Sequence, residues 1–160
     1  MAQEIERTFL VDPTRLAAVI ATATDSNAIV QGYLSTEPVV RVRRKGERAY
    51  LTVKGPGLVE RAEFEYAIPP EDVPALLGLC PRPPIEKVRY DVPYGDRTWE
   101  IDVFSGANAG LILAEVELPS QNAALDLPPW AGPEVTTDPR YTNAALASHP
   151  YGEWAQQPHR

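Results

Sequence analysis

The sequence predicts a mainly β domain, of the α+β type, in which a few short helices accompany an antiparallel sheet. Apolar and polar residues alternate with a period of two in eight segments, which is typical of strands with two unlike faces. Clusters of glycine, proline, asparagine and aspartate separate several of these segments and predict tight turns. The chain has 17 prolines among its 160 residues. They argue against long helices, because proline lacks a backbone donor and fixes φ.

The predicted strands follow one another through short connections. Residues 45–47, 55–57 and 94–96 supply turn residues between neighbouring strands. The length fits a single domain, which we expect over residues 1–148, followed by a polar tail at residues 149–160. In chain order the strands are expected at residues 4–11, 28–35, 38–45, 49–54, 60–68, 85–93, 97–104 and 111–118.

Three short helices are predicted between or after the strands. Residues 14–23 carry apolar side chains at helical spacing and follow Asp12-Pro13. The aspartate can cap the first turn, and the proline fits the first helical position. Residues 70–79 follow a pair of prolines, and residues 139–147 follow Asp138, with apolar side chains again three to four residues apart.

Ionisable residues on the predicted strands come in pairs of like charge, two residues apart. Because side chains alternate across a strand, the members of a pair lie on one face, about 6.6 Å apart along the strand. Like charges that adjoin on a sheet face destabilise it, so repeated pairs need a partner that bridges them. The pairs are Glu4 and Glu6, Arg41 and Arg43, Glu63 and Glu65, Lys87 and Arg89, Glu100 and Asp102, and Glu115 and Glu117.

This alternation has two interpretations. In the simpler one the sheet is half solvated, with an apolar inner face and a charged outer face. In the other the sheet closes with its charged face inward, so that acids and bases converge on a lumen. Such a lumen must hold water and ions, since an unpaired buried charge costs several kcal/mol. The repeated like-charge pairs favour the second interpretation.

The overall composition argues against several classes of protein. The 15 basic and 22 acidic side chains give a net charge of −7, which argues against a surface that coats nucleic acid. The single cysteine, Cys80, cannot form an internal disulfide and indicates a reducing compartment. No apolar run approaches the ~18 residues of a membrane helix, and the N-terminus does not resemble a secretory signal. We therefore expect a cytoplasmic protein that binds neither nucleic acid nor membrane.

The charged faces also predict a chemistry. Facing carboxylate pairs offer the hard oxygen ligands that Mg²⁺ and Mn²⁺ prefer. Arginine and lysine offer donors to phosphate oxygens, and six of the seven charged residues between positions 41 and 54 are basic. A divalent ion would neutralise charge that develops during phosphoryl transfer. The pattern thus predicts metal-dependent cleavage of a phosphoanhydride by water, in which positioning and electrostatics carry most of the rate.

An ordered series of motifs resembles one known family. Glu4-Ile-Glu6-Arg7-Thr8 resembles the N-terminal ExExK signature of the CYTH superfamily, the triphosphate tunnel metalloenzymes. The resemblance runs over about residues 2–148 and looks most like the short bacterial branch of inorganic triphosphatases. It implies a closed eight-stranded antiparallel β-barrel with a charged lumen and short helices packed outside. The further matching motifs are Gln31-Gly-Tyr33, Arg41-Val-Arg43, Thr52-Val-Lys54, Glu63-Phe-Glu65, Glu86-Lys87-Val-Arg89-Tyr90, Glu100-Ile-Asp102, Glu115-Val-Glu117 and Asp138-Pro-Arg140-Tyr141-Thr-Asn143.

The same resemblance implies a role for most of the charged residues. It implies metal-binding acids, with Mg²⁺ or Mn²⁺ as the ion, a second set of acids that could hold a further ion, and triphosphate-binding bases. We assign catalysis to Glu4, Glu6, Thr8 and Lys87. The metal-binding acids are Glu4, Glu6 and Glu117, the second set is Glu63, Glu65 and Glu115, and the bases are Arg41, Arg43, Lys54, Lys87 and Arg89.

Four residues have less settled roles. Tyr33 alternates with its neighbours in a way that points it to the lumen, where it is a candidate substrate contact. Glu100 and Asp102 could bind metal or pair with the bases. Arg140 could contact phosphate or cap the last helix.

Thr8 departs from the family signature, which has lysine at this position. Threonine is neutral and shorter, so it can orient a water molecule by hydrogen bonding but cannot supply charge. Weaker hydrolysis, a changed substrate and binding without turnover are all open outcomes. Because every other charged position is kept, we expect reduced but real activity.

The expected function is divalent-metal-dependent hydrolysis of inorganic triphosphate to pyrophosphate and phosphate, by a monomer or homodimer. One alternative is hydrolysis of an organic triphosphate, such as a nucleotide or thiamine triphosphate. A second is adenylate cyclisation, and a third is a weakly active or non-catalytic module that binds polyphosphate. The organic substrates would share the phosphate and metal residues and differ at the tunnel mouth.

Overall fold

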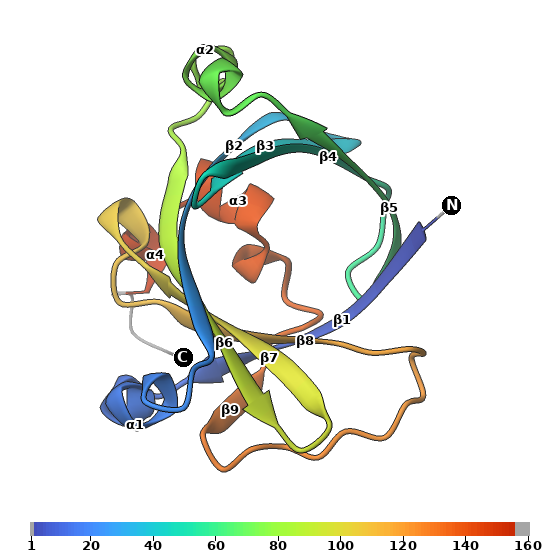
Figure 1. The fold of residues 1–160 in the computed structure, drawn as a ribbon, viewed down its shortest axis with the longest axis vertical. Helices are drawn as coiled ribbons and strands as arrows, with labels where there is room; N and C mark the ends of the chain where they lie inside the picture. The colour runs from blue at the N-terminus through green and yellow to red at the C-terminus, as the bar shows by residue number, and fades with distance from the viewer. Residues whose placement is uncertain (1, 156–160) are drawn as a thin grey trace.

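Eight antiparallel strands close into a barrel, which Figure 1 shows as a ring of ribbons. The structure is a computed structural model that describes residues 2–155, with side chains from Ile5 onward. The hydrogen-bonded order is β5-β4-β3-β2-β6-β7-β8-β1, and β1 pairs back with β5. The predicted fold, a mainly β chain with a closed eight-stranded barrel, is confirmed. The strands are β1 (Ala2–Val11), β2 (Asp25–Thr36), β3 (Val39–Lys45), β4 (Arg48–Lys54), β5 (Glu60–Ile68), β6 (Ile85–Tyr94), β7 (Arg97–Phe104) and β8 (Ile112–Glu117).

A ninth strand, β9 (Ala131–Glu134), lies outside the barrel and pairs with β1. The sequence did not predict it, because its four residues lack the alternation of a two-faced strand and include a proline. Proline is tolerated at such an edge position, where no further strand needs its missing donor. Glu134 at the end of β9 forms an ion pair with Arg7 of β1, with 2.7 Å between Oε1 and Nη2.

All three predicted helices are present, and each begins as a 3₁₀ turn that starts on proline. Side-chain oxygens cap two of these turns: Asp12 accepts from Thr14 N at 2.9 Å, and Asp138 accepts from Arg140 N at 3.1 Å. The 3₁₀ turns are η1 (Pro13–Arg15), η2 (Pro70–Asp72) and η4 (Pro139–Tyr141), which lead into α1 (Leu16–Ile20), α2 (Val73–Gly78) and α3 (Asn143–Ser148).

Two further short elements were not predicted. The 3₁₀ turn η3 (Gly106–Asn108) connects β7 to β8, and helix α4 (Tyr151–Trp154) lies in the segment expected to be a polar tail. The ring of Trp154 packs edge-on against the rings of Tyr141 and Tyr151, 5.2 and 5.1 Å away. No helix within residues 2–155 is long and apolar enough to span a membrane.

The apolar faces of the strands point out of the barrel and are covered from outside. Below the ring in Figure 1, α1 and the segment that contains β9 cover a cluster centred on Trp99, which contacts Phe9 and Trp130 at ring distances of 5.5 and 5.3 Å. Above the ring, α2 covers a second cluster that includes Val42 and Ala49. Because these clusters supply apolar burial outside the barrel, the inward face is left for charged side chains.

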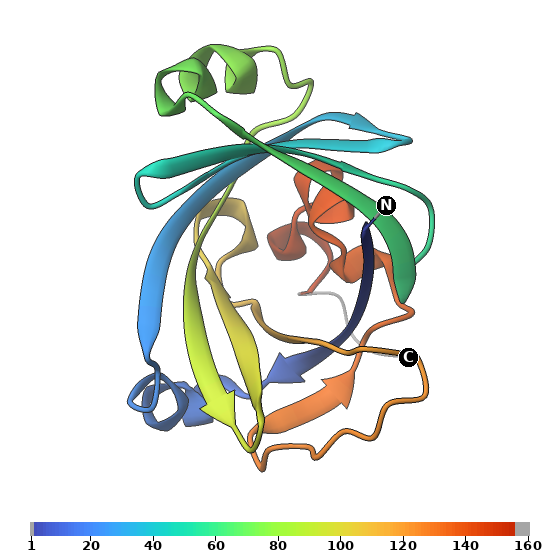
Figure 2. The same cartoon turned by 45° about the vertical axis from the view of Figure 1, so that its right-hand side comes forward.

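One end of the barrel interior is apolar and is filled by α3, which is seen through the ring in Figure 1 and beside the strands in Figure 2. The inward-facing residues Tyr33, Phe104 and Leu113 are buried here. They pack in one cluster with Leu146 and Ala147 of α3. The charged half of the interior therefore begins where this packed end stops.

Candidate active site

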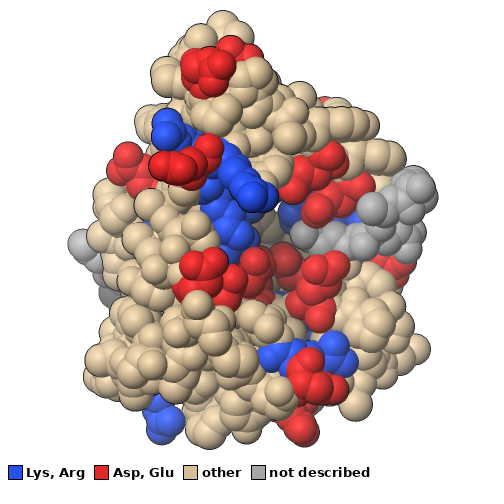
Figure 3. All heavy atoms as spheres, in the orientation of Figure 1, with Lys and Arg blue, Asp and Glu red and all other residues tan. Residues whose placement is uncertain are grey.

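The charged half of the barrel interior contains a pocket of about 310 Å³. Figure 3 shows the hollow at the centre of one face of the molecule, with basic atoms on one flank and acidic atoms on the others. This arrangement matches the predicted lumen, in which bases and acids converge. The ionisable lining residues are Glu6, Arg41, Arg43, Lys45, Lys54, Arg61, Glu63, Glu65, Arg89, Glu100, Glu115, Glu117 and Asp138, together with Tyr33, Tyr50 and Tyr141.

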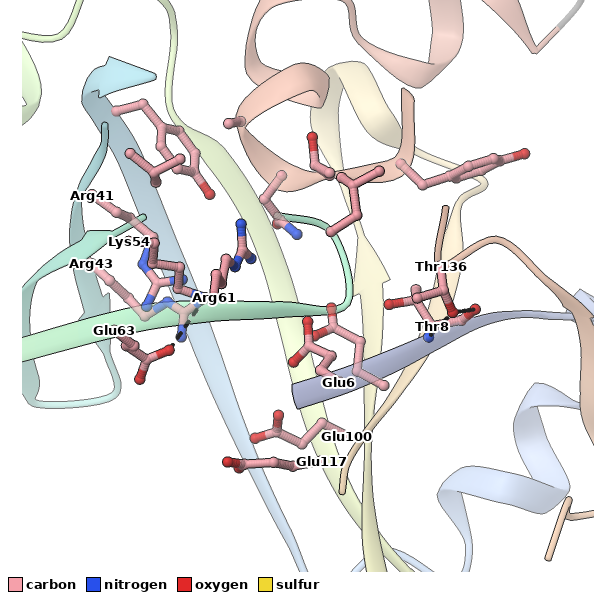
Figure 4. Close-up of a pocket in the computed structure, with 18 of the residues that line it drawn as sticks. Glu6, Thr8, Arg41, Arg43, Lys54, Arg61, Glu63, Glu100, Glu117 and Thr136 are labelled. Atoms are coloured by element: carbon pink, nitrogen blue, oxygen red, sulfur yellow. Dashed lines mark hydrogen bonds and ion pairs between the residues drawn. The ribbon is translucent and has the colours of Figure 1, made fainter. Parts of the chain in front are cut away.

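A wall of cations forms the side of the pocket that β3 and β4 build, on the left of Figure 4. Arg41, Arg43 and Lys54 lie on this wall and are all buried. Two acids of β5 partly balance them: Lys54 Nζ lies 3.5 Å from Glu63 Oε2, and Arg41 Nη2 lies 3.8 Å from Glu65 Oε2. Glu63 and Glu65 therefore accompany the bases.

Arg43 sits in an environment that disfavours its own charge. Burial, together with the neighbouring cations Arg41 and Arg89, lowers the pKa of its guanidinium to about 9. Its Nε donates to the neutral Oε1 of Gln31 at 2.7 Å. Arg41 Nε is buried and has no hydrogen-bond partner among residues 5–155. An anion in the pocket would relieve both conditions, since it would offset the repulsion and supply an acceptor.

Below this wall, β6 and β7 hold a buried triad of one acid and two bases. Asp102 is fully buried and lies 2.6 Å from Lys87 Nζ, while its two oxygens accept from Arg89 Nε and Nη2 at 2.7 and 2.9 Å. Burial alone would raise the pKa of Asp102, but the Arg89 and Lys87 cations outweigh burial and lower it. Asp102 therefore pairs with the bases.

Lys87 differs from the other predicted phosphate-binding bases because it does not line the pocket. Its side chain is fully buried beneath the pocket and reaches Asp102 and Asn143, the latter at 2.9 Å. Burial, reinforced by the charges of Arg89 and Arg43, outweighs the attraction of Asp102 and lowers the pKa of Lys87 to about 8. Arg89, by contrast, both lines the pocket and contacts Asp102.

The opposite side of the pocket is a wall of carboxylates on three adjacent strands, at the lower centre of Figure 4. Glu6 of β1 lies directly across from Glu117 of β8, and Glu115 of β8 lies across from Glu100 of β7. Burial raises the pKa of Glu100, and the negative charges of Glu115 and Asp102 raise it further against the attraction of Arg89. Like charges that face one another across strands call for a cation between them.

The structure separates the predicted metal-binding acids into two groups. Glu6, Glu115 and Glu117 share the carboxylate wall, whereas Glu63 lies across the pocket beside the cations in Figure 4. Glu4 lies in β1 opposite Arg61, and its side chain is outside the described residues. Within the described part of the chain, no three acidic, histidine or cysteine side chains are close enough to form a complete metal site.

Thr8 lies on the pocket wall, across from Glu115 and next to Thr136. Figure 4 shows the two threonines side by side. The backbone N–H of Thr8 donates to Thr136 Oγ1 at 3.0 Å, and this hydroxyl donates to Glu134 at 2.6 Å. Where the family signature has a lysine, this chain therefore lines the pocket with neutral threonine hydroxyl groups.

Two of the residues with open roles take definite places. Tyr33 is buried at the pocket lining, where its hydroxyl accepts from Gln31 Nε2 at 3.0 Å. Arg140 lies outside the pocket on an exposed surface, paired with Asp138 at 2.7 Å and stacked 4.6 Å from the Trp154 ring.

Sequence reasoning assigned no role to Gln31, Thr136 or Asn143, which the structure places at the site. Gln31 and Asn143 stood within quoted motifs, but their neutral side chains gave no charge pattern to interpret. Thr136 lies in an irregular segment where no periodic signal was available.

Comparison with known proteins agrees with this geometry. A family model described as the CYTH domain matches residues 2–149. The chain belongs to the CYTH family.

This CYTH protein is similar to two curated relatives, each named inorganic triphosphatase. It is 41% identical over 157 residues to the protein of Acetivibrio thermocellus, which covers 94% of this chain and 97% of the relative. It is 38% identical over 154 residues to that of Nitrosomonas europaea, with 90% and 96% coverage. A solved inorganic triphosphatase structure superposes with a TM-score of 0.62 at 36% identity, covering 92% of this chain and 95% of that one.

A more distant solved structure supports the fold alone. A protein of Pyrococcus horikoshii superposes with a TM-score of 0.58 at 21% identity, over 74% of this chain and 80% of its own.

The residues of this CYTH protein fit the metal dependence that is general in the family's triphosphatases. The carboxylate wall offers only oxygen donors, which suit a hard divalent cation. The facing carboxylates of this wall repel one another, and the pKa of Glu100 is raised. A bound cation would offset the repulsion and lower that pKa.

Proposed function

We propose that this protein hydrolyses inorganic triphosphate to pyrophosphate and phosphate with a bound Mg²⁺ or Mn²⁺ ion. The observation that carries the proposal is one pocket with a buried cationic wall facing a carboxylate wall. The names of the two similar relatives point to the same substrate. The expected setting is the cytoplasm, and the active form is a monomer or a homodimer.

The cationic wall binds the substrate. Arg41, Arg43, Lys54 and Arg89 line the pocket and donate to phosphate oxygens, and the two guanidiniums of β3 can do so in bidentate fashion. Lys87 acts from beneath the pocket. Its charge strengthens the positive potential at the pocket floor, and its contact with Asp102 helps hold Arg89 in place.

The carboxylate wall holds the metal. In the described part of the chain, Glu6, Glu115 and Glu117 would be its ligands once a bound cation draws their carboxylates together, and Glu4 is assigned to the same role from its place in the signature. Glu63 and Glu65, assigned to a second ion from the sequence, lie with the bases and serve first to orient them. When bound, the ion neutralises charge on the phosphate oxygens during transfer to water.

Phosphate release from triphosphate, ATP and thiamine triphosphate tests the proposal, each with Mg²⁺, Mn²⁺ or EDTA. We expect triphosphate to be hydrolysed fastest, only with metal, and to yield one phosphate and one pyrophosphate. Faster release from ATP or thiamine triphosphate would assign the organic substrate instead. No release from any of the three, together with a raised melting temperature in triphosphate, would identify a binding module.

Thr8 gives a prediction about rate. Thr8→Lys restores the family residue on the pocket wall beside Glu115, and we expect it to raise kcat for triphosphate by about tenfold because it adds a cation and a donor. Thr8→Val keeps the shape, removes the hydroxyl that can orient water, and should lower kcat by about tenfold. Steady-state kinetics measure both. A Thr8→Lys variant with unchanged or lower kcat would show that Thr8 is adapted to another ligand.

A further inference from the structure

Two cations fix the orientation of two amide side chains at the pocket, those of Gln31 in β2 and Asn143 in α3. Arg43 Nε can only donate, so the Gln31 atom that it meets at 2.7 Å must be the carbonyl oxygen. The other end of the Gln31 amide is therefore its NH₂ group. That group donates to Tyr33 Oη at 3.0 Å and to Asn143 Oδ1 at 3.1 Å.

The same reasoning applies independently to Asn143, the first residue of α3. An ammonium group has no acceptor, so the Asn143 atom that lies 2.9 Å from Lys87 Nζ must also be the carbonyl oxygen. Gln31 donates to that same oxygen. Two separate donors thus agree on one orientation of the Asn143 amide.

This orientation leaves the Asn143 NH₂ group facing the pocket. Asn143 lines the pocket, and among residues 5–155 its Nδ2 has no hydrogen-bond partner. Nδ2 is not among the buried, unpartnered atoms, so it remains accessible. The bases nearest in the network are Arg43 and Lys87, which also favour an anion at this position.

We propose that Asn143 is a substrate-binding residue whose Nδ2 donates a hydrogen bond to a phosphate oxygen of the triphosphate. This inference rests on the proposed function and adds a neutral contact, contributed by the helix that fills the barrel end. Gln31 is its positioning residue, because it holds the Asn143 carbonyl and the Arg43 guanidinium at once. The binding surface is therefore built from the strands and from α3 together.

The test is triphosphate binding in EDTA by isothermal titration calorimetry, which needs neither metal nor turnover. Asn143→Asp keeps an oxygen acceptor for Lys87 and Gln31 but replaces the NH₂ donor with a negative oxygen. We expect it to weaken triphosphate binding about 10- to 100-fold, the loss of a hydrogen bond to a charged group. Asn143→Ala should weaken binding about tenfold. Both variants should raise KM for triphosphate more than they lower kcat.

Asn108→Asp is the matched control for stability. Asn108 is a buried asparagine outside the pocket, and its Oδ1 accepts from Tyr151 N at 2.8 Å. We expect it to leave triphosphate binding unchanged, whatever its melting temperature. Wild-type affinity in Asn143→Asp, or equal losses of affinity in Asn108→Asp, would overturn the proposal.

The wild-type protein separates this inference from the proposed function. If wild type neither binds nor hydrolyses triphosphate, the proposed function fails and the Asn143 contact fails with it. If wild type binds and hydrolyses triphosphate while both Asn143 variants behave like it, only the Asn143 contact is wrong.

Discussion

Arg41→Met is expected to lower kcat/KM for triphosphate by about 100- to 1,000-fold while leaving the ligand-free protein at least as stable as wild type. Arg41 lines the pocket, so the variant loses a charge-assisted donor to the substrate, and the loss of one such donor has about this effect on rate. Methionine has a similar length and fills the space of the arginine stem.

The stability of the variant follows from the surroundings of Arg41 in the absence of substrate. Within the described part of the chain, its Nε is buried without a hydrogen-bond partner and its ion pair with Glu65 is long, at 3.8 Å; Arg41 also repels Arg43. Replacing a poorly paired buried charge with an apolar side chain is often neutral or stabilising. We expect the free energy of unfolding to stay unchanged or rise by about 1 kcal/mol.

Urea unfolding and steady-state kinetics measure the two halves of this prediction. Arg140→Met is the matched control, because Arg140 is an exposed arginine outside the pocket and should change neither quantity by much. A loss of more than about 2 kcal/mol in Arg41→Met with wild-type kinetics would show that Arg41 is a structural cation.

Asp102→Asn is expected to destabilise the fold by about 3–5 kcal/mol, the cost of leaving buried charges without their counter-charge. The variant keeps the size of the side chain but removes the negative charge that Lys87 and Arg89 share. Glu100, at 3.2 Å from Arg89, remains and compensates in part. Urea unfolding at pH 7 measures the loss, and binding of triphosphate should fall as Arg89 loses its anchor.

The pH dependence of this effect has a definite sign. The pKa of Asp102 is lower in the folded protein than its ordinary value of 3.8, because the two bases favour its charged form. The stability that Asp102 contributes is thus fully present above that ordinary value and is lost as pH falls toward the folded pKa. The difference between wild type and Asp102→Asn should be constant from pH 5 to 7 and shrink below pH 4.

A control at the surface separates the effect of burial from the effect of removing a negative charge. Glu134→Gln removes an acid that pairs with Arg7 on a half-exposed site, and surface pairs contribute about 0–1 kcal/mol. A loss in Asp102→Asn no larger than that in Glu134→Gln would contradict the view that Asp102 neutralises the floor of the pocket.

The period-two alternation predicted the barrel strands well, because each strand has one charged and one apolar face. Alternation is a local property, so it identified which residues share a face. It could not identify β9, whose four residues follow no such pattern and gain their place only by pairing with β1. It also left open which face was buried, a question that α1, α2 and β9 settle by covering the apolar one.

The sequence did not predict which charged residues of the site contact one another. Glu63 and Glu117 look alike as members of Glu-x-Glu pairs, yet one lies beside Lys54 and the other across from Glu6. Strand register and closure decide this, and both depend on residues far apart in the chain. For the same reason Lys87 was grouped with Arg89, although it lies beneath the pocket and not on its surface.

The packed apolar end of the barrel has a consequence for how long chains of phosphate are handled. If the protein accepts a linear polyphosphate, only the terminal units can reach the charged walls, because the packed apolar end of the barrel prevents a polymer from passing through. Hydrolysis would then proceed from the chain ends. Its rate would depend on the concentration of free polyphosphate termini more than on the total concentration of phosphate units.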